Sequence, residues 1–183
     1  MSRSARPSTR EEILAAASRL FAAAGFKGTS LQDIAGAVGC SKAALLYHFD
    51  GKDAILAELL APAVEAFRAL DARLAALDDE AVRPAAVEGY VDLVLRFRRE
   101  VTVLYGDIPE LLQRPAFAGV HELTERLREA LTGRSRTPQA CAAALLVLGG
   151  VPVACMEQPD VDAGELREVL VRSAARALDV PGS

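Results

Sequence analysis

Apolar residues recur along this chain at intervals of three and four, and no run of alternating β-branched residues or hairpin-like turn interrupts them. This spacing places apolar side chains on one face of a helix, so the pattern predicts helices nearly throughout and an all-α fold. The helices expected from the pattern run over about 8–24, 31–38, 42–48, 53–77, 85–104, 116–131, 138–157 and 165–178.

Capping residues and glycines predict the boundaries of the first three helices. Thr9 with Glu12 three residues later has the spacing of a capping box, and Gly25 is expected to end the helix that they open. Gly39 is expected to end the second helix, and Ser41 to cap the third. The N-terminal segment is therefore predicted to hold three helices joined by short turns.

Residues 30–49 have the spacing of a helix-turn-helix. Ala35 is small enough to let a second helix cross closely, and Gly39 tolerates the positive φ of the turn. The apolar residues that would hold the two helices together are Val38, Cys40 and Leu45. An ordinary corner between two helices would show the same spacing, so at this point both interpretations stand.

The N-terminal third also resembles a known family. The residues that carry the resemblance are Thr9, Ile13, Ala17, Leu20, Phe21, Gly25, Thr29, Ser30, Ile34, Ala35, Gly39, Ser41, Lys42, Leu45, His48, Phe49 and Lys52. In type and spacing they resemble the N-terminal domain of the TetR family of bacterial transcriptional regulators over about residues 8–60. The family usually has an aromatic residue, often a phosphate-contacting tyrosine, where this chain has Leu46, and here Tyr47 follows.

The resemblance implies a two-domain regulator. Residues 1–52 would form a three-helix helix-turn-helix domain that binds double-stranded operator DNA, and residues 53–183 a helical domain that binds an effector and dimerises. Most members of the family repress transcription and release a palindromic operator when a small molecule binds, so the same is expected here.

The distribution of charge agrees with a DNA-binding head. The whole chain has a formal net charge of −4, but residues 1–52 carry seven basic and four acidic side chains, a net +3. The remainder is therefore at −7. A basic segment on an acidic body is typical of proteins that contact nucleic acid through one domain.

A recognition helix enters the major groove by its N-terminal end, which here begins at Lys42. Lys42 is the candidate donor to a guanine edge or an adjacent phosphate, whereas Ala43 and Ala44 allow close approach or contact with a thymine methyl. Direct readout is therefore expected to be sparse. The residues suited to contacting phosphates are Ser30, Ser41, Tyr47, His48 and Lys52.

Aromatic and aliphatic residues at helical spacing in the C-terminal part form a core by default, and in the resembling family the same helices wall a ligand cavity. The residues predicted to contact an apolar or amphipathic effector are Phe67, Tyr90, Leu93, Phe97, Phe117, His121 and Leu145. The helix over 53–77 begins beside the DNA-contacting residues, and Pro62 is expected to kink it. A ligand that favoured one of its positions would couple the two sites.

The segment 137–156 has no charged residue and is near the length that spans a bilayer. Its Gly149, Gly150 and Pro152 argue against a membrane span, so we expect no membrane association. A helix that is apolar all round must then be buried on more than one side, which predicts a homodimer through 138–157 and 165–178. The small and apolar residues expected there are Ala142, Leu146, Gly150, Val153, Val169, Leu170, Ser173, Ala174 and Ala177.

Several other classes of protein are disfavoured. The three cysteines form no CxxC and no second His or Cys lies at ligand spacing, so neither a metal nor a cofactor is expected. The motifs GxGxxG, Walker A, HExxH and GxSxG are absent, so the chain is not expected to be an enzyme. The N-terminus lacks an apolar signal segment, and a cytoplasmic location is expected.

Two alternatives remain open on the sequence alone. One is a small helical enzyme or carrier that contains an incidental helix corner, and turnover without salt-sensitive DNA binding would distinguish it. The other is a DNA-binding regulator that has no effector, which a C-terminal domain without a ligand-sized cavity would favour.

Overall fold

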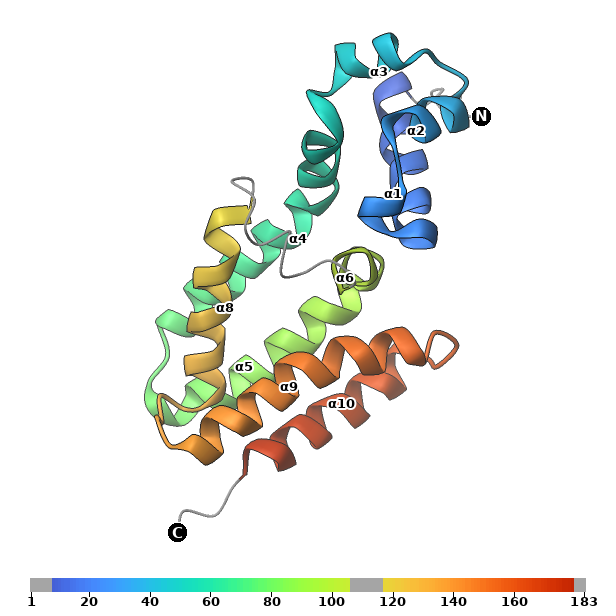
Figure 1. Cartoon of the computed structure of the whole chain (residues 1–183). Helices are drawn as coiled ribbons and strands as arrows, with labels where there is room; N and C mark the ends of the chain where they lie inside the picture. The colour runs from blue at the N-terminus through green and yellow to red at the C-terminus, as the bar shows by residue number, and fades with distance from the viewer. Residues whose placement is uncertain (1–7, 106–116, 180–183) are drawn as a thin grey trace, which may run out of the picture. The chain divides into compact units, whose positions relative to one another are not determined.

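The computed structural model describes residues 8–105 and 117–179, and within these residues the chain is helical and has no strand (Figure 1). The all-α fold is therefore confirmed. The helices are α1 (Thr9–Gly28), α2 (Leu31–Val38), α3 (Lys42–His48), α4 (Gly51–Ala75), α5 (Asp79–Arg96), α6 (Arg98–Tyr105), α8 (Ala118–Leu131), α9 (Pro138–Glu157) and α10 (Ala163–Leu178).

The chain divides into two compact units within α4, at Pro62. The first unit holds α1, α2, α3 and the beginning of α4. The second unit holds the rest of α4 together with α5, α8, α9 and α10. The functional boundary expected at residue 52 stays a prediction, and so does the kink at Pro62.

The first helix begins one residue earlier than predicted. Ser8, not Thr9, is the N-cap: its Oγ accepts the Glu11 N–H at 3.3 Å, and the Glu11 carboxylate accepts the Ser8 N–H at 2.7 Å. Gly25 breaks the helical path as expected, because its φ of 75° and ψ of 166° are accessible mainly to glycine. A further turn after this kink reaches Gly28.

The region after α4 also differs from the predicted boundaries. Asp78 accepts the Ala81 N–H and caps α5 at Asp79, so residues 79–84 are helical and not a polar connection. The single helix expected over 85–104 is two helices, because Phe97 leaves the helical path with a φ of −111° and a ψ of 34°. The irregular stretch expected over 105–115 lies almost wholly outside the described residues.

The first unit is held together by an apolar core that all of its helices share. Helix α2 contacts both α1 and α3. The largest side chains that are fully buried in this unit are Ile13, Phe21, Ile34, Leu45, Ile55, Leu56 and Leu60. Because Leu45 is on α3, the third helix is fixed to the body of the unit by one side and presents the other to solvent.

In the second unit α5 is the central element, since it contacts α8, α9 and α10. The second half of α4 also approaches α5 closely: a Cβ on Gly89 would meet a methyl of Leu70 and the guanidinium of Arg73, so these two side chains would have to move to admit it. Ion pairs support the outside of the unit, with Arg126 Nε 2.8 Å from Asp71 and Arg167 Nε 2.5 Å from Asp92.

Helix α9 is positioned by side chains of α5 and α6. Pro152 has no N–H, so the Leu148 carbonyl loses its helical donor, and the Tyr90 hydroxyl donates to that carbonyl at 2.6 Å. At the end of α9, Arg98 Nε donates to the Cys155 carbonyl at 2.6 Å, and the guanidinium also reaches Gln158. By length and composition α9 is apolar enough to cross a membrane, yet one of its sides packs into the core of this unit.

Candidate nucleic-acid interface

Helices α2 and α3 form the predicted helix-turn-helix. Ser30 caps α2, with its Oγ accepting the Asp33 N–H at 3.1 Å, and Ser41 caps α3 by accepting the Ala44 N–H at 3.1 Å. Between them Gly39 adopts a left-handed conformation with a φ of 76°, and its N–H bonds to the last turn of α2. The turn is therefore specified by three local signals that the sequence displays.

One side of α3 is buried and the other faces solvent. Leu45 and the following Phe49 belong to the core of the first unit. The exposed residues of the helix are Lys42, Ala43, Leu46 and Tyr47. Of the residues predicted to read bases, Lys42 and Ala43 lie on this open face and Ala44 is half-buried at its edge.

The structure gives the two capping serines different capacities for phosphate contact. The backbone N–H and the hydroxyl of Ser30 both donate to the Asp33 carboxylate, at 2.8 and 2.7 Å. These hydrogen bonds hold the pKa of Asp33 below its ordinary value, and the bond from the Ser30 hydroxyl has the larger effect. The carboxylate therefore stays charged and keeps both donors occupied. Ser30 is thus placed as a helix cap. The Ser41 O–H has no acceptor among the described residues, so it fits a phosphate contact better.

Tyr47 is the most exposed aromatic side chain of this helix, with 87% of its surface open. Its ring meets the His48 ring edge-on at a centroid distance of 5.4 Å, and His48 itself is half-buried. Of this pair, Tyr47 therefore has the greater reach toward a phosphate backbone.

Lys52, which is predicted to contact a phosphate, also makes contacts within the first unit, and its phosphate contact stays a prediction. Its Nζ donates to the carbonyls of Phe26 and Thr29, at 2.5 and 2.7 Å, and lies 4.2 Å from the centroid of the Phe26 ring. The cation thus closes the C-terminal end of α1, where carbonyls have no helical donor. The structure places Lys52 as a support of the first unit.

A second cation holds α4 against the rest of the first unit. The Arg10 guanidinium makes a bidentate ion pair with Glu58 and stacks 4.8 Å from the centroid of the Phe49 ring. Because Phe49 directly follows α3, this contact links α1, α4 and the end of the candidate recognition helix. These contacts join the end of α3 to α1 and α4.

Leu46 is the residue of the open face that the sequence-based prediction of contacts did not include. It is 45% exposed and one helical turn after Lys42. Its position beside the buried Leu45 was visible in the sequence, because consecutive helical residues point in different directions.

The residues predicted to bind an effector are only partly brought together. Tyr90 belongs to the core of the second unit, and Phe67 and Leu93 pack against that core. Phe97 is buried at the end of α5. The remaining predicted residues do not join them: His121 and Leu145 are exposed, and Phe117 is grouped with the other unit.

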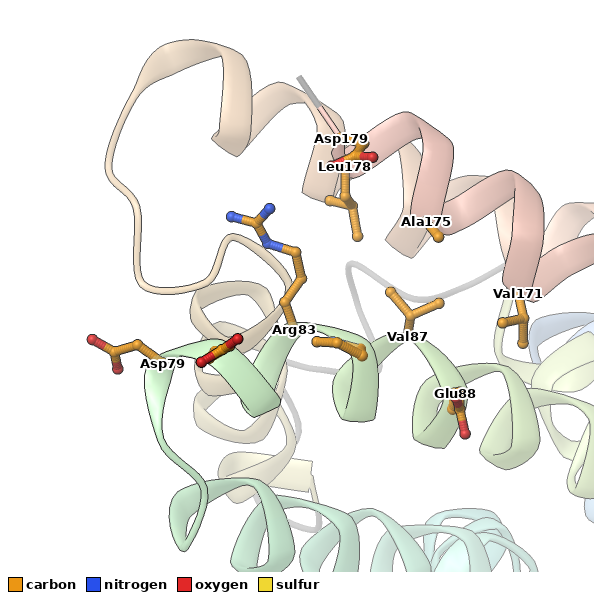
Figure 2. A pocket seen from close by; sticks show the side chains of 10 residues that line it. Asp79, Arg83, Val87, Glu88, Val171, Ala175, Leu178 and Asp179 are labelled. Atoms are coloured by element: carbon orange, nitrogen blue, oxygen red, sulfur yellow. The ribbon is translucent and has the colours of Figure 1, made fainter. Parts of the chain in front are cut away.

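Among the surface hollows that the described residues of the second unit form, we consider two, and neither is lined by the predicted effector residues. The first, of about 500 Å³, lies between the N-terminal part of α5 and the C-terminal part of α10. Figure 2 shows Arg83 and Val87 facing Ala175 and Leu178 across it. The second, of about 450 Å³, has four arginines in its lining, beside Asp71 and Glu129. Both are edged by charged side chains.

The exposed side of α9 is largely apolar, and α10 adds apolar and small residues beside exposed charged ones such as Arg172 and Arg176. Six large apolar side chains are exposed among the described residues, and four of them, Leu145, Leu146, Val153 and Val169, lie on these two helices. Together with the exposed small residues Ala142, Gly150, Ser173 and Ala177 they form what we call the α9–α10 stripe. Leu170 and Ala174, also expected there, are buried in the core of their own unit.

Comparisons with known proteins agree with this architecture. Residues 13–59, which include α2 and α3, match the family described as "Bacterial regulatory proteins, tetR family". The HTH-type transcriptional repressor KstR2 of Rhodococcus jostii (strain RHA1) is 27% identical over 132 residues, which are 71% of this chain and 65% of that protein. This chain thus spans just under two thirds of the length of that relative.

Two solved structures are similar over nearly the whole chain. AmtR of Mycobacterium smegmatis is 28% identical, with 100% of this chain and 92% of that chain covered and a TM-score of 0.72. The ketosteroid transcriptional regulator KstR2 of Mycobacterium tuberculosis has the same TM-score and 94% of each chain covered. It is 16% identical, so this second likeness is one of fold.

Proposed function

Because this chain belongs to the TetR family of bacterial transcriptional regulators, we propose that it binds operator DNA through α3 and represses transcription where it is bound. The observation that carries the proposal is the open face of α3, which is held on a rigid unit and begins with Lys42. The activity is binding and not catalysis, and it is exerted in the cytoplasm.

On DNA, the N-terminal end of α3 enters the major groove. Lys42 donates to a guanine edge or to a neighbouring phosphate, and Ala43 permits close approach. Ser41 and Tyr47 contact phosphates and fix the register of the helix. Ser30 and Lys52 also hold the unit together through their hydrogen bonds, and the half-buried Ala44 and His48 lie at the edge of the open face.

The α9–α10 stripe supports a homodimer. Exposed apolar patches of this kind mark protein–protein contacts, and a two-fold dimer buries the same patch on both subunits. Two recognition helices related in this way read a pseudo-palindrome whose half-sites lie about 34–36 Å apart, or one further turn. The dimer interface is formed by residues 138–157 and 165–178 of both subunits.

We also propose that an apolar or amphipathic small molecule releases the protein from DNA. The proposal is supported by four of the predicted effector residues, which lie in or against the apolar part of the second unit: Phe67, Tyr90, Leu93 and Phe97. Helix α4 runs from the first unit into the second, so a ligand that displaces its second half would reach the unit that carries α3. Couplings of about 1–3 kcal/mol, or 5–150-fold in DNA affinity, are typical of such regulators.

The test is selection of DNA from a random duplex library by the full chain, followed by titrations of the selected sequence. We expect a palindromic site whose preference over random DNA is relaxed by Lys42→Ala. A matched control is Arg68→Ala, which removes an exposed cation that pairs with Glu65 on α4. Enrichment of no sequence, or equal effects of the two substitutions on base preference, would contradict the proposal.

The effector is sought by thermal shift, since a ligand at 100 times its Kd stabilises the folded state by about 2.7 kcal/mol. A compound that raises the melting temperature is then added to the DNA titration. Operator affinity that is unchanged by every stabilising compound would favour regulation without an effector.

A further inference from the structure

Of the six large apolar side chains that are exposed in the described part of the chain, two lie far in sequence from the α9–α10 stripe. They are Leu46 and Tyr47, on α3, and they are 45% and 87% exposed. Tyr47 has a hydroxyl that can reach a phosphate, but Leu46 has no donor or acceptor at all. If α3 contacts DNA as proposed, this aliphatic side chain can be buried there without leaving a polar group unpaired only against an apolar group of the DNA.

The position of Leu46 on α3 limits what that partner is. Leu45, its neighbour, is fully buried, so Leu46 points away from the core of the unit. Lys42 lies one helical turn before it on the same open face, and Ala43 lies three residues before it. Leu46 therefore enters the groove beside the group that Lys42 contacts, with a small residue next to it that permits close approach.

The largest apolar group that the major groove offers to such a side chain is the C5-methyl of thymine. Most of the other groups that the base edges present there are hydrogen-bond donors or acceptors, and the phosphates are charged. Burial of a leucine against any of these would leave the polar group without a partner, which costs free energy. Contact with a thymine methyl removes two apolar surfaces from water instead.

Leu46 also stands where the resembling family usually has an aromatic residue that often touches a phosphate. With leucine there, this position loses a hydrogen bond to the backbone and gains an apolar surface. We propose that Leu46 is a specificity-determining residue, which selects operators that have a thymine at one position of each half-site. The proposal rests on the proposed function and assigns a base to one residue of that same surface.

The experiment replaces thymines of the selected operator by deoxyuridine, one symmetric pair at a time. This change removes the C5-methyl and keeps both the base pair and its hydrogen-bonding groups. Burial of one methyl corresponds to about 4-fold in affinity, so we expect a loss of about 15-fold for one symmetric pair and little loss elsewhere. A loss spread evenly over all thymines, or none at any, would overturn the proposal.

The same titration with the Leu46→Ala variant tests whether Leu46 is the residue that contacts the thymine methyl. The variant is expected to bind the thymine and deoxyuridine operators with equal affinity, while Lys42→Ala retains the difference. Leu46→Asn keeps the length and branched shape of the side chain but makes its end polar. It is expected to lose the difference in the same way, which covers the case in which the alanine variant folds poorly. A full penalty for deoxyuridine in both Leu46 variants would assign the methyl to another residue and refute the proposal.

These outcomes differ from a failure of the proposed function itself. If the wild-type chain selects no DNA sequence, regulation through α3 is wrong. If it selects a sequence but is indifferent to every thymine methyl, binding stands and the role of Leu46 is wrong.

Discussion

Gly150→Arg is the substitution that most directly tests the dimer. Gly150 is exposed in the middle of the α9–α10 stripe, and a Cβ added there would meet no atom within 4 Å in the isolated protomer. Arginine is also a better helix former than glycine, by roughly 0.5–1 kcal/mol. The fold of a single protomer should therefore tolerate the change.

In the dimer the same arginine enters an apolar interface. An uncompensated charge buried in this way costs about 3 kcal/mol or more. Two-fold symmetry brings in the arginine of both subunits, so we expect a loss of about 6 kcal/mol and a dimer Kd raised by about 10⁴. Binding to a palindromic operator should fall with it, because a protomer alone holds one half-site.

Analytical ultracentrifugation over a dilution series is the assay, with circular dichroism to compare helix content. Gly119→Arg is the matched control: Gly119 is exposed on α8, outside the stripe, and a Cβ there also meets nothing within 4 Å. The control should remain dimeric. A wild-type chain that sediments as a monomer at micromolar concentration, or a Gly150→Arg variant that stays dimeric, would refute the reasoning.

Three further predictions follow from contacts within each unit. Lys52→Met should lower the free energy of unfolding of the first unit by about 1.5–3 kcal/mol, because two carbonyls at the end of α1 lose a charged donor. The salt dependence of DNA affinity should stay unchanged, and a flatter salt slope would contradict this. Tyr90→Phe should lower the free energy of unfolding, measured in urea, by about 1–3 kcal/mol. The loss should be much smaller in a Pro152→Ala background, because the Leu148 carbonyl there regains a helical N–H donor. Equal losses in both backgrounds would argue against the hydrogen bond. Cys155 should be alkylated more slowly than Cys40 in the native protein, because burial raises the pKa of its thiol; peptide mass spectrometry that finds equal rates would exclude this.

The elements that the sequence predicted best are those with short-range signals. Helices α2 and α3 have the predicted bounds because Ser30, Gly39 and Ser41 each act on groups within four residues. The start of α1 was harder, since Ser8 with Glu11 and Thr9 with Glu12 both have the spacing of a capping box. Two equivalent local signals differ by one residue, and only packing decides between them.

The candidate DNA-contacting surface was predictable where a residue's direction follows from helical periodicity. Lys42 and Tyr47 are exposed as expected, and the same periodicity would have identified Leu46. Lys52 could not be assigned in this way. The carbonyls that it holds are 23 and 26 residues earlier in the chain, and a lysine that reaches back to them has the same local sequence as one that reaches a phosphate.

The contacts of Tyr90 show why the predicted effector site could not be derived from the local sequence. From sequence, Pro152 predicts that a carbonyl one turn earlier lacks its helical donor, but it does not identify the group that replaces it. The structure supplies that group from 58 residues away, so the tyrosine that is predicted to contact an effector also holds α9 to α5. A ligand that binds beside Tyr90 must either leave this hydrogen bond in place or offer the Leu148 carbonyl another donor. Since α9 also bears the stripe proposed as the dimer interface, a ligand that breaks the bond would act on the helix that, in the proposed dimer, would set the distance between the two recognition helices.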